Sequence, residues 1–109
     1  MNLIHLKEKN IIKKLTKSDI DKHLQLINGW SLKEDFSSIS KTFIFKNFKE
    51  AFSWMTNISI EAEALNHHPE WSNVYNKVDV HLSTHDVSGL SKKDFLIASY
   101  MDQQFISRK

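Results

Sequence analysis

The chain has 109 residues, 40% hydrophobic and 26% charged, which is typical of one globular domain. It contains no cysteine, which excludes disulfides, thiolate metal sites and a cysteine nucleophile. The net charge of +2 is too balanced to indicate direct nucleic-acid binding, and no segment approaches the ~20 apolar residues of a membrane span.

The N-terminal segment is weakly patterned. We expect residues 1–14 to form an arm and residues 15–109 to form a single domain. The arm lacks the long apolar run and small-residue cleavage site of a secretory signal, so we expect a cytoplasmic protein.

The first helix is predicted over residues 17–27. Thr16 and Asp19 have the spacing of a capping box, in which each side chain bonds the other residue's backbone N–H. Apolar residues then recur at helical spacing, and Asn28-Gly29 is a strong stop signal. Two strands are expected next, over 30–35 and 40–45, the second because it is β-branched and aromatic.

The second helix is predicted from about residue 48 until the chain approaches Pro69, which forces the preceding residue out of the helical region. Its expected buried stripe follows a 3–4 spacing through Phe48, Ala51 or Phe52, Met55, Ile58, Ala62 and Leu65. Trp54 and Ile60 lie off this stripe. Apolar residues on more than one side indicate self-association, as a homodimer or homotetramer.

Two further strands are predicted over 70–75 and 78–84, with a turn at Asn76-Lys77. Alternation places His81 among polar residues on the face opposite Val80, where we expect it to contribute little to activity. The last helix should begin after Ser91, whose spacing to Asp94 repeats the capping pattern. The order αββαββα predicts an α+β fold: a four-stranded antiparallel sheet with three helices packed on one face.

Three histidines are the main candidates for chemistry. His67 and His68 close the second helix, and His85 lies in the loop after the fourth strand. Imidazole exchanges protons near neutral pH, but a histidine pair at a helix C-terminus is also a plain capping pair. His81 and His85 have the i, i+4 spacing of a helical zinc pair, yet in a strand this spacing spans ~13 Å, which disfavours a shared metal.

The segment from residue 63 to residue 100 resembles the pterin-4a-carbinolamine dehydratase family. The residues that carry the resemblance are His67-His68-Pro69-Glu70-Trp71, Asn73-Val74-Tyr75-Asn76-Lys77-Val78, Leu82-Ser83-Thr84-His85, Gly89-Leu90-Ser91 and Asp94. Asn66 and Asp86 depart from the family's commonest residues. Neither change removes a histidine.

The resemblance implies dehydration of a 4a-hydroxytetrahydropterin to the quinonoid dihydropterin, a hydro-lyase reaction that recycles the pterin cofactor of aromatic amino acid hydroxylases. It implies no metal and no organic cofactor. By the same resemblance, His67, His68 and His85 would be catalytic, with Glu63 and Trp71 in support. Glu63 lies one helical turn before His67, so we expect an i, i+4 contact that steadies the His67 ring. The pterin would be bound by His67, His68, Pro69, Thr84, His85, Asp86 and Val87.

A different class of function stays open. Some members of this family act as a dimerisation cofactor for a homeodomain transcription factor, so the chain could serve as a non-enzymatic binding module. If it is an enzyme, the three histidines should converge on one pocket, because proton transfer needs near hydrogen-bond reach.

Overall fold

The computed structural model describes residues 12–108, so the predicted arm over 1–14 lies almost entirely outside the described residues. In chain order the elements are α1 (Lys17–Leu24), β1 (Ser31–Leu32), β2 (Ile39–Ile44), α2 (Phe48–Leu65), β3 (Glu70–Val74), β4 (Lys77–Leu82), the short 3-10 helix η3 (His85–Val87) and α3 (Lys92–Ile106). The predicted αββαββα order is confirmed, with η3 as an addition inside a segment expected to be a loop.

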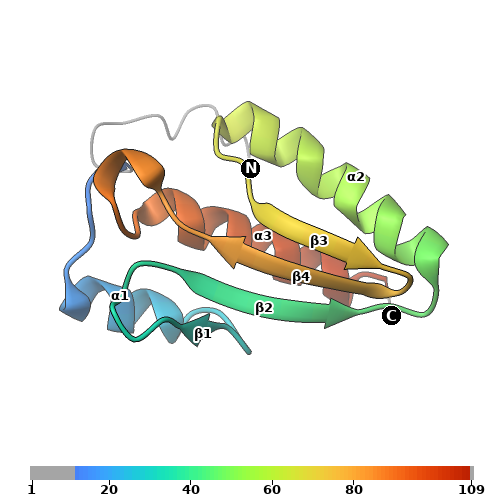
Figure 1. Ribbon diagram of the computed structural model, residues 1–109, viewed down its shortest axis with the longest axis horizontal. Coiled ribbons are helices and arrows are strands. Elements are labelled where there is room, and N and C mark those ends of the chain that lie inside the picture. Colours follow the sequence, from blue (N-terminus) through green and yellow to red (C-terminus); the bar gives the residue numbers. More distant parts are fainter. Residues whose placement is uncertain (1–11, 109) are drawn as a thin grey trace.

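The four strands form one antiparallel sheet in the order β1-β2-β4-β3. Figure 1 shows α3 behind the sheet and α2 running alongside β3. One face is therefore covered by helices. On that face Phe43 lies opposite Val78, and both are buried. The other face carries exposed side chains such as Thr42 and His81, so the predicted one-sided packing is confirmed.

Aromatic side chains dominate the core between the sheet and the helices. The Phe43 and Trp54 ring centroids are 4.6 Å apart, and Trp54 is fully buried. Its indole Nε1 donates a hydrogen bond to the Met101 carbonyl (3.1 Å), which satisfies the one polar atom that this ring buries. The core thus ties β2, α2 and α3 together.

The helix starts follow the predicted capping logic. Both capping boxes form, Thr16 with Asp19 at α1 and Ser91 with Asp94 at α3. The α2 helix instead begins at Asn47, whose side chain accepts from the Glu50 N–H. Each cap satisfies backbone donors that a helix leaves without partners.

Two elements, α1 and β1, are shorter than predicted by three residues or more. The α1 helix ends at Leu24, because the next residues tighten into i to i−3 turns in which Leu26 bonds the His23 carbonyl. β1 has two residues, because the Asp35 side chain bonds the Ser37 N–H and starts a turn in place of continued pairing.

The buried stripe of α2 differs from the predicted one. Its buried residues are Ala51, Trp54, Ile58, Ala62 and Leu65, which also have 3–4 spacing. Trp54 therefore belongs to the core and is unavailable to a partner. Phe48 and Phe52 are about half exposed. Within residues 12–108 no helix combines the length and the apolar composition that crossing a membrane requires.

The β3–β4 hairpin has a two-residue turn at Tyr75 and Asn76, one residue earlier than predicted. Tyr75 adopts φ 51° there. The Asn73 side-chain amide donates to the carbonyls of Tyr75 (3.0 Å) and Lys77 (2.9 Å), so one side chain clamps both sides of the turn. This clamp fixes the pairing of β3 with β4.

Candidate functional site

The end of α2 sends two adjacent histidines in different directions. Asn66 caps the helix in the left-handed conformation, with φ 54°, and the His67 N–H returns to the Ala62 carbonyl (2.9 Å). Asparagine tolerates this conformation better than most residues. After this bend the His67 side chain is buried, whereas His68 remains exposed.

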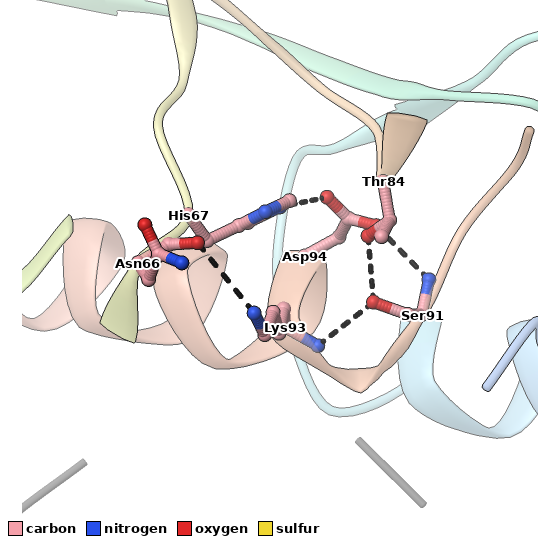
Figure 2. A network of polar contacts seen from close by, with 6 residues as sticks. All are labelled: Asn66, His67, Thr84, Ser91, Lys93 and Asp94. Carbon is pink, nitrogen blue, oxygen red and sulfur yellow. Dashed lines mark hydrogen bonds and ion pairs between the residues drawn. The ribbon is translucent and has the colours of Figure 1, made fainter. Parts of the chain in front are cut away.

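His67 belongs to a buried polar network. Figure 2 shows its ring pointing at Asp94, and the Nε2 to Oδ1 distance is 2.6 Å. Asp94 Oδ2 accepts from the Thr84 hydroxyl (2.7 Å) and from the Ser91 N–H (3.0 Å). A carboxylate only accepts, so Nε2 of His67 carries the hydrogen of this bond, and Nδ1 is the ring nitrogen that remains.

Asp94 joins this network, although the only role that the sequence predicted for its side chain was that of a helix cap. It is fully buried at the first turn of α3. Its carboxylate completes the capping box and also receives His67 and Thr84. Because Thr84 directly precedes His85, this one carboxylate connects the end of α2 to the segment that carries the third histidine.

Glu63 does not take the predicted partner. Its Oε1 lies 2.8 Å from Nε2 of His68, and the two side chains are 80% and 61% exposed. The expected i, i+4 contact with His67 is wrong, because the left-handed Asn66 turns the His67 ring towards α3. His68, Glu63, Pro69 and Trp71 line a hollow of about 610 Å³ together with Ser59, Ile60 and Ala62.

His85 begins η3 and lines a larger hollow, of about 730 Å³, on the open face of the sheet. The other lining residues are Ser31, Leu32, Lys33, Ser37, Ser38, Ser40, Glu70, His81, Ser83, Thr84, Ser88 and Gly89. Asp86 and Val87 follow in η3 without lining this hollow. Sequence reasoning missed Glu70 and His81 as site residues, although the predicted alternation places His81 on this face.

The structure thus groups the predicted residues in three places. His85 and Thr84 line the larger hollow, His68 and Pro69 line the smaller one, and His67 is joined to Thr84 through Asp94. Convergence of the three imidazoles on one substrate stays a prediction. Among residues 12–108 no group of three histidine, aspartate or glutamate side chains is arranged to hold a metal ion.

Comparison with known proteins identifies the family of this chain. The family model described as pterin 4 alpha carbinolamine dehydratase matches residues 13–104. The chain belongs to this family. The pterin dehydratase family includes a relative from Rhizobium meliloti (strain 1021) that is 59% identical over 90 residues, covering 83% of this chain and 86% of the relative.

Two other comparisons extend the family assignment. The pterin-4-alpha-carbinolamine dehydratase of Drosophila melanogaster is 46% identical over 101 residues, covering 91% of this chain and 53% of that protein. A crystal structure from Brucella melitensis, described as a transcriptional coactivator/pterin dehydratase, has a TM-score of 0.81 and 38% identity. It covers 84% of this chain and 98% of the Brucella chain, so the pterin dehydratase fold extends over nearly all of the described residues.

Proposed function

We propose that this protein dehydrates a 4a-hydroxytetrahydropterin to the quinonoid dihydropterin and water, with histidines as the general acid and base. Membership of the pterin dehydratase family supports the substrate class. The three histidines support the chemistry, because imidazole both donates and accepts protons at neutral pH.

The reaction requires two proton transfers and no electron transfer. An acid protonates the hydroxyl on carbon 4a, and the carbon–oxygen bond breaks with release of water. A base removes the proton from ring nitrogen 5, and the freed electron pair forms the double bond between nitrogen 5 and carbon 4a. Two imidazoles on opposite sides of this bond would supply both steps, without a metal or an organic cofactor.

The network at Asp94 carries the proposal. It holds the His67 ring through Nε2, so that Nδ1 would be the nitrogen that acts on the substrate, while Thr84 positions the chain directly before His85. Fixed rings need little reorganisation during proton transfer. His68, paired with Glu63 at the edge of the smaller hollow, would bind the pterin ring or exchange a proton with it.

The test is the decay of freshly generated 4a-hydroxytetrahydropterin, followed by absorbance with the uncatalysed rate subtracted. We expect the wild-type protein to accelerate the decay and His85→Ala to remove most of the acceleration. The matched control is His23→Asn, which deletes an imidazole that contacts Phe95 in the core and lines neither hollow. Folded protein without acceleration would contradict the proposal.

A second candidate function is an interaction module. It is favoured by the exposed apolar residues on α2: Phe48, Phe52 and Ile60 are 49%, 54% and 64% exposed. The Phe48 and Phe52 rings pack against each other, at 5.6 Å between centroids. We propose that this face binds a second copy of the chain, so that Phe52→Glu would shift the mass measured by light scattering towards the monomer. Wild-type protein that is already monomeric at micromolar concentration would exclude this.

A further inference from the structure

A polar row crosses the open face of the sheet at the end where His85 lies. Ser31 is in register with Ser40, Ser40 with His81, and His81 with Glu70, so the row includes one residue from each strand. Residues in register on neighbouring strands project from the same face. All four line the larger hollow, together with His85.

The polar groups of this row have no partners within the described part of the chain. Among residues 12–108, the side chains of Ser40, His81 and Glu70 form no hydrogen bond or ion pair. The hydroxyls of Ser83 and Ser88, further along the same hollow, are likewise unpaired in this part of the chain. By contrast, the nearby Thr84 hydroxyl bonds Ser91 and Asp94.

The lining of the hollow favours a neutral ligand rich in hydroxyl groups. Leu32 is its one large apolar side chain within the described residues, so an apolar ligand would leave many polar groups unsatisfied. Its fixed charges are balanced, with the Glu70 carboxylate against the Lys33 ammonium. Hydroxyl groups both donate and accept, as this mixture of serines, a carboxylate and an imidazole requires.

We propose that this row binds the polyhydroxylated side chain of the pterin substrate and so selects substrates that carry one. The inference rests on the proposed function. In a pterin, the side chain is attached to carbon 6, which is two bonds from the reacting carbon 4a. Because His85, Ser83 and His81 line the same hollow, a ring that reacts beside His85 would extend its side chain into that hollow, towards the polar row. The volume of about 730 Å³ accommodates ring and side chain together.

The experiment compares two substrates that differ only at carbon 6, one with a methyl group and one with a 1,2,3-trihydroxypropyl group. We expect the wild-type protein to have the higher kcat/KM for the trihydroxypropyl substrate. Ser40→Ala and His81→Leu should each reduce the ratio of the two kcat/KM values about 3- to 10-fold, as expected for the loss of one hydrogen bond.

The matched control is Ser72→Ala. Ser72 is an exposed serine of β3 on the same face of the sheet, in register with Asp79 and outside the hollow. It should leave the ratio unchanged. A ratio near one in the wild-type protein, or an equal change in Ser72→Ala, would overturn the inference while the proposed function stands.

If neither substrate turns over, a binding measurement tests the role of the polar row separately from the proposed dehydration. Unreactive 7,8-dihydropterins with the same two side chains serve as probes, and their dissociation constants are measured by calorimetry. Tighter binding of the trihydroxypropyl compound, lost in His81→Leu and kept in Ser72→Ala, would support the polar row although dehydration had failed. Equal binding of both compounds would overturn it.

Discussion

His67 and His68 are neighbours in the chain, and each has a carboxylate partner at almost the same distance, 2.6 Å to Asp94 and 2.8 Å to Glu63. Their surroundings differ completely. The His67 and Asp94 side chains are 9% and 0% exposed, whereas those of His68 and Glu63 are 61% and 80% exposed. Distance alone therefore says little about what an imidazole–carboxylate pair contributes.

The difference arises from solvent. Water screens the exposed pair and readily replaces either partner, so such pairs contribute little to stability. A buried carboxylate that loses a partner has no water to replace it. We therefore expect His67 and Asp94 to be required for a formed site, and His68 with Glu63 to adjust how a ligand is held.

The largest expected effect is on turnover. Replacing His67 or His85 should lower the dehydration rate by ~10²–10⁴-fold, the usual contribution of a general acid or base. His67→Gln is the sharper variant, because its amide can still donate to Asp94 but cannot titrate. Rates are measured per mole of folded protein, after far-ultraviolet circular dichroism confirms the fold.

The double variant of His67 and His85 sharpens the same test. If both rings serve one proton relay, the combined loss should be far smaller than the product of the single losses. Full turnover in either single variant would remove that residue from the catalytic roles.

A smaller effect concerns stability. Asp94→Ala should lower the free energy of unfolding by about 3–5 kcal/mol, because it leaves His67, the Thr84 hydroxyl and the Ser91 N–H without their acceptor. Glu63→Ala is the matched change at the exposed pair and should cost less than about 1 kcal/mol. Urea denaturation of both variants gives the comparison. Equal losses would show that burial is not what distinguishes the two pairs.

The smallest effect concerns a histidine outside both pairs. Burial lowers the pKa of His23 from its ordinary value of 6.5, and Lys92 lowers it further. Below about pH 6.5 the unfolded chain therefore binds more protons at this position than the folded chain. The contribution of His23 to the free energy of unfolding is thus fully present above about pH 6.5 and is lost as the pH falls through the lowered pKa of the folded state.

His23→Gln tests this pH dependence. Urea midpoints measured between pH 5 and 8 should fall less steeply on acidification in the variant than in the wild-type protein. Parallel declines would show that other groups account for the acid sensitivity.

Much of the fold could be predicted from local patterns. Capping at Thr16 and Ser91, the proline after α2 and the alternation in β4 each depend on residues close in sequence, and each is confirmed. The predicted stripe on α2 included Met55 and left out Trp54, because these neighbours are both large and apolar. Only the tertiary packing of Trp54 against Phe43 and Met101 shows that Trp54 is the buried one.

The site shows the same limit. A helix-ending histidine pair and a histidine after a strand are visible in the sequence. The partner of His67 was not, because Asp94 lies 27 residues away and already had a local role as a helix cap. His81 shows a related limit: alternation places it on a polar face without helices, but only the tertiary fold shows that this face carries a hollow.

The amide of Asn73 has a consequence beyond its own turn. Side chains alternate between the faces of a strand, so a shift of β3 against β4 by one residue would exchange the side chains that β3 places on the two faces of the sheet. Glu70 would turn to the core and Trp71 would turn to the open face. A one-residue insertion at Tyr75-Asn76 would therefore change which side chains of β3 line the hollow and so which ligand groups it can bind. The insertion would have this effect although it lies at the opposite end of the hairpin from Glu70.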